Sequence, residues 1–253
     1  MNELPNTTSD RKSVVFVTMH KAASVFVNRV LDLVLTNEGM VHVDFAGEAF
    51  TSGTKEWEYC VSKSHLFSTP GYYFGAFRGP YIDKFESLAD NRIVVQVRDP
   101  RDCIVSLYYS YKFSHGAPGE GVLKKIFNRI RTHVEETDID SFALEQAKTY
   151  SRRLSMITDL CNKYDDYTLL TYENMVLDFP SWESQLYTYL DVDPPEPIRT
   201  QVADLANFDV PSEDVTQHKR QVVPGDHKRK LKPATIEEMN TILAEHLTQY
   251  GYL

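Results

Sequence analysis

The chain has 253 residues, of which 42% are hydrophobic and 25% charged, and its formal net charge is −9. This composition is ordinary for a globular protein, and the length allows a substantial core without covalent cross-links. The negative charge argues against a general affinity for nucleic acid or anionic membranes. An anionic ligand would therefore need a local basic pocket.

The three cysteines, Cys60, Cys103 and Cys161, have no paired spacing. A sparse, odd set indicates a reducing compartment and predicts neither a zinc site nor a disulfide framework. Residues 1–12 are polar and do not resemble a signal peptide, and no apolar run approaches membrane-spanning length. We therefore expect a cytoplasmic protein with a flexible tail over residues 1–12 and no integral membrane segment.

Short apolar runs predict buried strands, and amphipathic stretches between them predict helices. The predicted strands cover residues 13–19, 92–97 and 167–173. The predicted helices cover residues 24–37, 100–112, 141–164, 181–190 and 235–252. This alternation predicts a single α/β domain over residues 13–253, with a central parallel sheet flanked by helices.

Residues 17–26, "VTMHKAASVF", join the first predicted strand to the first helix. Backbone amides and the dipole at a helix N-terminus favour an anion, and small residues let the backbone approach it. Lys21 would add a charge and Ser24 a hydroxyl. An ordinary turn with a surface lysine explains the loop equally well. The ATP-binding pattern GxxxxGK[ST] is absent.

The second predicted strand ends in "VVQVRDP". Asp99 and Pro100 suit a helix start, which leaves Arg98 at the strand end. A nucleotide triphosphatase would place a magnesium-binding acid there. Ser106 lies two turns along the helix, so Arg98 and Ser106 predict a second phosphate site. Two anion sites on one sheet imply a ligand with two separated phosphate-like groups.

Four motifs, in family order, resemble the sulfotransferases that use 3′-phosphoadenosine 5′-phosphosulfate (PAPS). "MHKAASVF" is similar to their 5′-phosphosulfate loop and "RDPRDCIVSLYYS" to their 3′-phosphate motif. "LLTYENM" resembles their "YED" strand end and "KRQVVPGDHKRKL" their C-terminal loop. The resemblance implies a P-loop nucleotide-kinase-like sulfotransferase fold, PAPS as donor and adenosine 3′,5′-bisphosphate as product.

The resemblance also implies a set of donor-binding residues. The 5′-phosphosulfate would contact Lys21 and the amides of Ala22, Ala23, Ser24 and Val25. The 3′-phosphate would contact Arg98 and Ser106, adenine would contact Phe26 and Tyr172, and the C-terminal loop would add Arg220 and Gly225, with Asp226 and Lys228 beside them. Core aromatics and a flexible basic loop are alternative explanations for Phe26, Tyr172 and the C-terminal segment.

Several positions depart from the family pattern. Ala23 replaces a glycine, and His227 replaces a tryptophan. In the C-terminal motif, Gln221 and Val222 replace lysine and glycine. The family's dimer motif, KxxxTVxxxE, does not fit "LKPATIEEMN", so the oligomeric state stays open.

Sulfuryl transfer requires a positioned donor, a neutralised leaving phosphate and a base for the acceptor hydroxyl. "VSKSHLF" resembles the family's "KTHLP" segment and implies His65 as base and Lys63 as a sulfuryl contact. Glu48 is the main rival, and His20 and His115 are weaker ones. Because a sulfuryl group carries less charge than a phosphoryl group, we expect no metal.

The acceptor is not readable from the sequence, and we expect a small or lipid-like molecule with a hydroxyl or, less favoured, an amine. Residues 66–90 are aromatic and turn-rich, and either line an acceptor pocket or form a packed loop. Residues 114–121 are typical of a mobile lid or a plain surface loop. Two other functions stay open: a P-loop small-molecule kinase that uses ATP and magnesium, and a non-catalytic nucleotide-binding protein.

Overall fold

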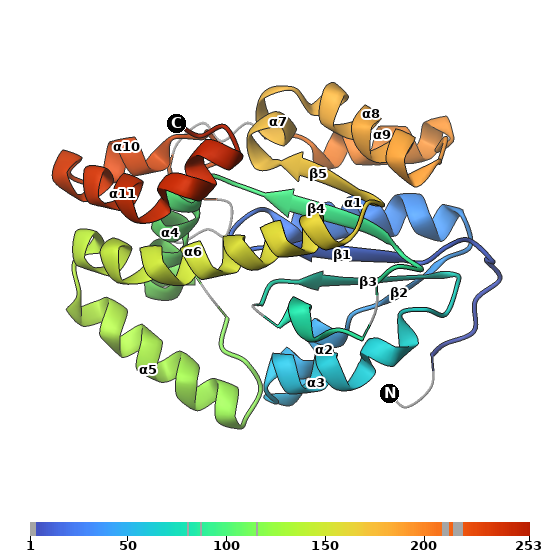
Figure 1. The fold of residues 1–253 in the computed structure, drawn as a ribbon, viewed down its shortest axis with the longest axis horizontal. Helices are drawn as coiled ribbons and strands as arrows, with labels where there is room; N and C mark the ends of the chain where they lie inside the picture. Colours follow the sequence, from blue (N-terminus) through green and yellow to red (C-terminus); the bar gives the residue numbers. More distant parts are fainter. Residues whose placement is uncertain (1–3, 80, 87, 115, 209–212, 215–219) are drawn as a thin grey trace.

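The computed structural model describes residues 4–79, 81–86, 88–114, 116–208, 213–214 and 220–253. Within them, five strands form one sheet in the order β2-β3-β1-β4-β5, and every neighbouring pair is parallel. Helices lie on both faces of this sheet (Figure 1). The strands are β1 (Val14–Thr18), β2 (Val41–Val43), β3 (Tyr72–Phe77), β4 (Arg92–Val97) and β5 (Tyr167–Thr171). The predicted α/β fold with a central parallel sheet is confirmed.

The central strand β1 is buried on both faces. Val14 and Phe16 belong to one apolar cluster, and Val15 and Val17 to the other. The first cluster includes residues of α1 (Ser24–Asn37), α8 (Phe179–Leu190) and α9 (Glu196–Leu205). The second includes residues of α4 (Pro100–Tyr109), α6 (Ile139–Lys163) and α11 (Pro233–Gln249). Continuous apolar strands are expected where helices cover both faces of a sheet.

The remaining helical segments connect these layers. They are α2 (Phe45–Ser52), α3 (Glu56–Lys63), α5 (Val122–Glu136), α7 (Tyr172–Leu177), α10 (Asp226–Lys230), the 3₁₀ turns Ser64–Leu66 and Ile82–Lys84, and the π turn Ser110–Ser114. None of the helices in the described segments is both long and apolar enough to cross a membrane.

Two strands were missed in the sequence. The strand β3 lies in residues 66–90, which we predicted to line an acceptor pocket or to form a packed loop. It was missed because "YYFGAF" carries a glycine and is buried on both faces, which removes the alternating pattern. The strand β2 has three residues, too few for a periodic signal.

Most of the predicted flexible tail is held against the domain. The Thr7 hydroxyl donates to the carbonyls of Gly39 and Gly71, which precede β2 and β3. The Arg11 guanidinium donates to the carbonyls of Leu190 and Asp191. These polar residues satisfy backbone groups before β2 and β3 and at the end of α8, and the flexibility of residues 1–12 stays a prediction.

Candidate active site

Three cations lie side by side at the carboxyl edge of the sheet. The strands β3, β1 and β4 are adjacent and parallel, and Arg78, Lys21 and Arg98 lie just beyond their carboxyl ends. Burial, followed by the charges of Arg98, Arg220 and Arg78, lowers the pKa of Lys21 to about 8. The parallel topology thus concentrates positive charge in a protein whose overall charge is negative.

The loop between β1 and α1 has a strained backbone. Lys21 has a φ of 71° and Ala23 a φ of 64°, both in the left-handed region. That conformation costs about 1–2 kcal/mol for a residue with a side chain, and such strain concentrates at functional sites. Ser24 opens α1, and its hydroxyl accepts a hydrogen bond of 2.8 Å from Arg78 Nε. The loop thus joins β1 to α1 as predicted, and Arg78 is a contact that the sequence did not reveal.

The side chain and the backbone of Lys21 contact two neighbouring elements. Lys21 Nζ donates to Ser110 Oγ at 3.1 Å, and its carbonyl accepts from Arg98 Nη1 at 3.0 Å. Ser106 is half-buried, one helical turn before Ser110. The structure thus brings Lys21 and Arg98 together as predicted.

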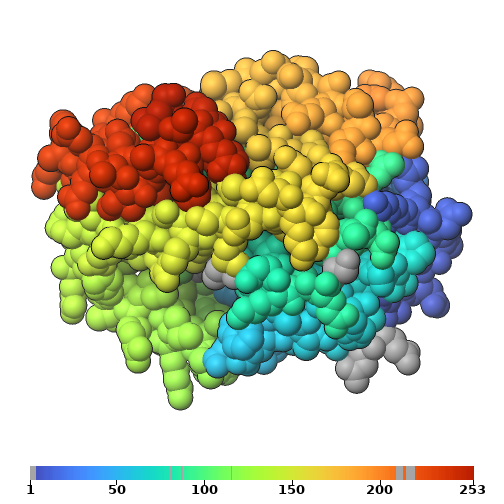
Figure 2. All heavy atoms as spheres, viewed as in Figure 1, coloured from blue at the N-terminus to red at the C-terminus, as the bar shows by residue number. Residues whose placement is uncertain are grey.

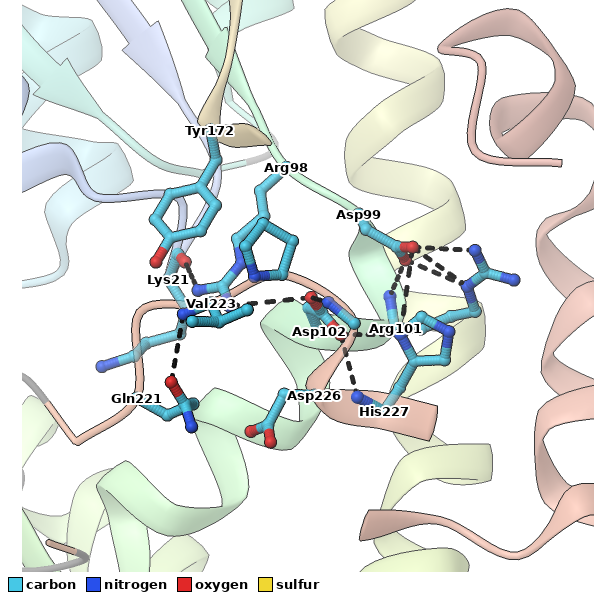
Figure 3. A network of polar contacts seen from close by, with 12 residues as sticks. Lys21, Arg98, Asp99, Arg101, Asp102, Tyr172, Gln221, Val223, Asp226 and His227 are labelled. Carbon is cyan, nitrogen blue, oxygen red and sulfur yellow. Dashed lines mark hydrogen bonds and ion pairs between the residues drawn. The ribbon is translucent and has the colours of Figure 1, made fainter. Parts of the chain in front are cut away.

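Arg98 directly follows β4 and lies beside Tyr172, which directly follows β5, and beside Val223 of the C-terminal loop (Figure 3). Its guanidinium carbon lies 4.0 Å from the centroid of the Tyr172 ring, and only 5% of the residue is exposed. The Tyr172 hydroxyl donates to the Val222 carbonyl at 2.7 Å. Tyr172 therefore connects Arg98 to the C-terminal loop.

In the described part of the C-terminal loop, ion pairs and a hydrogen bond hold Arg220 and Gly225 in place. Arg220 forms ion pairs with Glu213 and Asp226, and its guanidinium lies 4.2 Å from the centroid of the Tyr109 ring. Gly225 has a φ of 83°, and its amide donates to Asp102 Oδ2 at 2.7 Å. Lys228 is exposed.

The carboxylate of Asp102 also holds His227, the residue in the place of the family's tryptophan. One oxygen accepts hydrogen bonds from the His227 amide at 2.9 Å and from its ring Nδ1 at 2.6 Å. Burial pushes the pKa of Asp102 up, but the contacts with His227 and the charge of Arg98 outweigh it and hold that pKa at about 2. The network in Figure 3 ties α4 to the C-terminal loop.

His65 lies away from these cations. It is exposed in the 3₁₀ turn Ser64–Leu66, which precedes β3, whereas Arg78 follows the same strand. The next residue after the turn, Phe67, accepts a hydrogen bond from Asn91, directly before β4. His65 therefore belongs to the amino edge of the sheet. The structure therefore does not bring His65 together with the three cations, and the roles predicted for His65 and Lys63 stay predictions.

Two glutamates lie on helices next to the carboxyl edge. Glu48 accepts a hydrogen bond of 2.6 Å from the Tyr59 hydroxyl, and Glu56 accepts one from the Tyr81 hydroxyl. Burial raises the pKa of Glu56, although Tyr81 and the charge of Arg78 act in the opposite direction. Glu56, which the sequence did not single out, is thus within electrostatic range of the cations.

The other predicted rivals for the base have different placements. The backbone carbonyl of His20, beside Lys21, accepts a hydrogen bond of 3.1 Å from the Tyr150 hydroxyl. His115 lies outside the described residues.

Figure 2 shows a hollow in the surface between α6, α5 and the segments near α3.

The predicted lid, over its described residues 116–121, contacts the end of α2 through backbone. The Gly119 amide donates to the Phe50 carbonyl at 3.1 Å, and the Leu123 amide to the Gly53 carbonyl at 3.4 Å. A Cβ on Gly53 would lie 2.0 Å from the Glu120 carbonyl oxygen. This close approach leaves no room for a side chain at Gly53.

Comparisons with known proteins identify the class of enzyme. The family model described as "Sulfotransferase domain" matches residues 84–251. The chain is therefore a sulfotransferase by class, and it belongs to the sulfotransferase family. No curated protein sequence matches it. The kinase and non-catalytic alternatives are replaced by this assignment.

Solved structures agree with the fold. A mouse sulfotransferase, SULT7A1, complexed with PAP has 14% sequence identity and a TM-score of 0.65, with 94% of this chain and 86% of that chain covered. A retinol dehydratase in a complex with retinol and PAP has 12% identity and a TM-score of 0.52, with 94% and 82% covered.

Proposed function

We propose that the protein transfers the sulfuryl group of PAPS to a hydroxyl group of a small acceptor and releases adenosine 3′,5′-bisphosphate (PAP). The observation that carries this proposal is the row of Arg78, Lys21 and Arg98 on three adjacent strand ends, beside the N-terminus of α1. A donor with two phosphate groups matches two anion sites on one sheet edge. The two solved relatives with PAP support the same donor.

In this proposal the 5′ end of the donor lies on the loop between β1 and α1. Lys21 and the amides of residues 22–25 contact the phosphosulfate, and Arg78 reaches the same loop through Ser24. Arg98 and Ser106 hold the 3′-phosphate, with Arg220 and Gly225 from the C-terminal loop.

The adenine would lie against aromatic side chains. Phe26 is half-buried and packs against Phe179, Trp182 and Phe208, with ring centroids 6.0, 6.1 and 5.2 Å away. This packing holds the Phe26 ring in place and leaves part of it accessible. Tyr172, beneath Arg98, supplies the second aromatic contact.

The transfer step moves one group and one proton. The acceptor oxygen forms a bond to sulfur as the bond between sulfur and the phosphate oxygen of the donor breaks. Lys21 and Arg78 stabilise the negative charge that develops on that phosphate. A carboxylate takes the acceptor proton, and we assign this role to Glu56, with Glu48 as the rival. A carboxylate whose pKa is raised by burial is better matched to neutral pH than an ordinary one.

The three cations offer the donor its charge compensation from side chains, so we expect turnover without a metal. The described residues contain no group of three or more His, Cys, Asp or Glu side chains that could hold a metal ion. The acceptor proposal is a small hydroxylated molecule, in keeping with the retinol bound by the retinol dehydratase.

Calorimetry with PAP in EDTA, compared with ATP and magnesium, tests the donor assignment. We expect PAP to bind in EDTA and ATP to bind more weakly or not at all. Arg98→Ala should weaken PAP binding, and Arg92→Ala, at the opposite end of the same strand, should not. Loss of PAP binding in EDTA, or tighter binding of ATP, would contradict the proposal.

A further inference from the structure

Arg153 lies on the face of α6 that contacts the phosphate loop. Tyr150, one helical turn earlier, donates its hydroxyl to the carbonyl of His20, next to Lys21. The guanidinium of Arg153 lies 5.2 Å from the centroid of the Tyr150 ring. Its charge lowers the pKa of Glu56 and of Tyr111 against the larger effect of burial. Arg153 is therefore within electrostatic range of Glu56, the residue proposed as the base.

The guanidinium of Arg153 has two orphaned donors. Its Nε and Nη1 atoms are buried and have no hydrogen-bond partner among the described residues. An arginine cannot lose its proton, and a buried donor without an acceptor costs about 1–3 kcal/mol, more when it is charged. Such a group calls for an explanation in a native structure.

Other buried arginines of the same domain are paired with carboxylates. Arg101 forms an ion pair of 2.7 Å with Asp99, and Arg220 pairs with Asp226. Within the described residues, Glu56, whose pKa the charge of Arg153 lowers, forms no ion pair with it and accepts a hydrogen bond from Tyr81 instead. Two donors of Arg153 are therefore left available for an anionic group of a ligand.

We propose that Arg153 binds a carboxylate group of the acceptor, so that the substrates are hydroxylated carboxylic acids. This inference rests on the proposed function, because it concerns the acceptor of the same reaction. The carboxylate stays unchanged during transfer: the acceptor oxygen bonds to sulfur, its proton goes to Glu56, and Arg153 holds the anionic end. A desolvated guanidinium favours an anion over a neutral amide of the same shape, because the charge-assisted hydrogen bond is about twice as strong.

Matched pairs of acceptors test this specificity. Initial rates of PAP formation are measured with hydroxyphenylacetate and hydroxyphenylacetamide, and with a hydroxylated fatty acid and its amide. We expect kcat/KM for the acid to exceed that for the amide by roughly 10- to 100-fold, the range that one hydrogen bond to a charged group supports. In Arg153→Gln the preference should disappear, and in Arg153→Lys part of it should return.

Arg152 provides the matched control, because it is the adjacent residue, has the same charge and is exposed. Arg152→Gln should keep the preference. Calorimetry measures PAP binding by each variant and so tests the donor site and correct folding independently of the acceptor. A failure of the proposed function can therefore be distinguished from a failure of the inference about Arg153. Equal use of acid and amide, no product from any of the acids, or a preference that survives in Arg153→Gln would each overturn the inference.

Discussion

The ring Nδ1 of His227 lies 2.6 Å from a carboxylate oxygen of Asp102, although the two residues are 125 positions apart in the chain. The same carboxylate accepts hydrogen bonds from the backbone amides of Gly225 and His227, and one of its oxygens lies 3.8 Å from Arg98 Nη2. One buried acid therefore positions both Arg98 and the C-terminal loop.

Asp102→Asn should destabilise the protein by about 2 kcal/mol and weaken PAP binding, because it removes charge-assisted hydrogen bonds from a buried site. The pKa of Asp102 is about 2 in the folded protein, against an ordinary 3.8. Its stabilisation is therefore complete above about pH 4 and is lost as the pH falls towards 2. Urea unfolding should show the gap between wild type and variant narrowing over that interval. Asp193→Asn, which changes an exposed ion pair, is the control, and an equal effect from it would contradict the assignment.

PAP affinity should fall as the pH rises above about 8. The pKa of Lys21 is lowered to about 8 in the free protein, so Lys21 is charged below this value and neutral above it. Bound phosphate favours the charged form, so binding above pH 8 must take up a proton, and affinity falls by up to about tenfold per pH unit. Calorimetry in two buffers of different ionisation enthalpy measures this uptake. Lys21→Met should bind more weakly and take up no proton through this group; uptake that persists in this variant would assign the titration elsewhere.

Ala23→Gly should stabilise the protein by about 0.5–1 kcal/mol. Relief of the left-handed conformation is worth about 1–2 kcal/mol, and the greater freedom of glycine in the unfolded chain takes back about 0.4–1 kcal/mol. Ala22→Gly, at a buried neighbour with an ordinary φ, should instead destabilise. Urea unfolding of both variants decides, and a loss of stability in Ala23→Gly would mean that the loop is not strained at this position.

Glu56→Gln should lower kcat by roughly two to four orders of magnitude, the usual span for a lost general base, with PAP affinity almost unchanged. His65→Ala should keep kcat, because His65 lies at the opposite edge of the sheet. The wild-type rate should fall as the pH drops through the pKa of Glu56, which lies above the ordinary value for a glutamate. If Glu48→Gln or His115→Ala loses turnover while Glu56→Gln keeps it, the base is one of those rivals.

Arg78→Gln should lower kcat by about 10- to 100-fold, because its charge acts on the loop that holds the transferring group. Arg78→Lys should restore part of the rate. Arg92→Gln, at the amino end of β4 and so at the opposite edge of the sheet, is the matched control. Steady-state kinetics with saturating PAPS measures the effect, and an unchanged kcat in Arg78→Gln would restrict Arg78 to a structural contact with Ser24.

Local patterns were enough to predict the elements that carry the residues of the proposed donor site. Arg98 and Ser106 stand on one strand end and the helix that follows it, so their spacing in the chain is also their spacing in space. The Lys21 loop is predictable for the same reason, since a strand, a loop and a helix follow one another. The cellular location stays a prediction.

The acceptor side depends on contacts that no local pattern carries. Arg78 was missed because β3 was missed, and with it the strand end on which Arg78 stands. The sequence around His65 resembles a family motif, but His65 lies in a turn that precedes β3 and not after that strand. The pairing of Asp102 with His227, and the place of Arg153 on α6, follow from tertiary packing.

The order of the parallel strands has a consequence for enzyme engineering. Arg78, Lys21 and Arg98 stand on the three central strands, whereas Glu48, Glu56 and Arg153 stand on the helices around them. Libraries of substitutions on those helices should therefore change which acceptors the enzyme uses, while the residues at the strand ends continue to bind the donor.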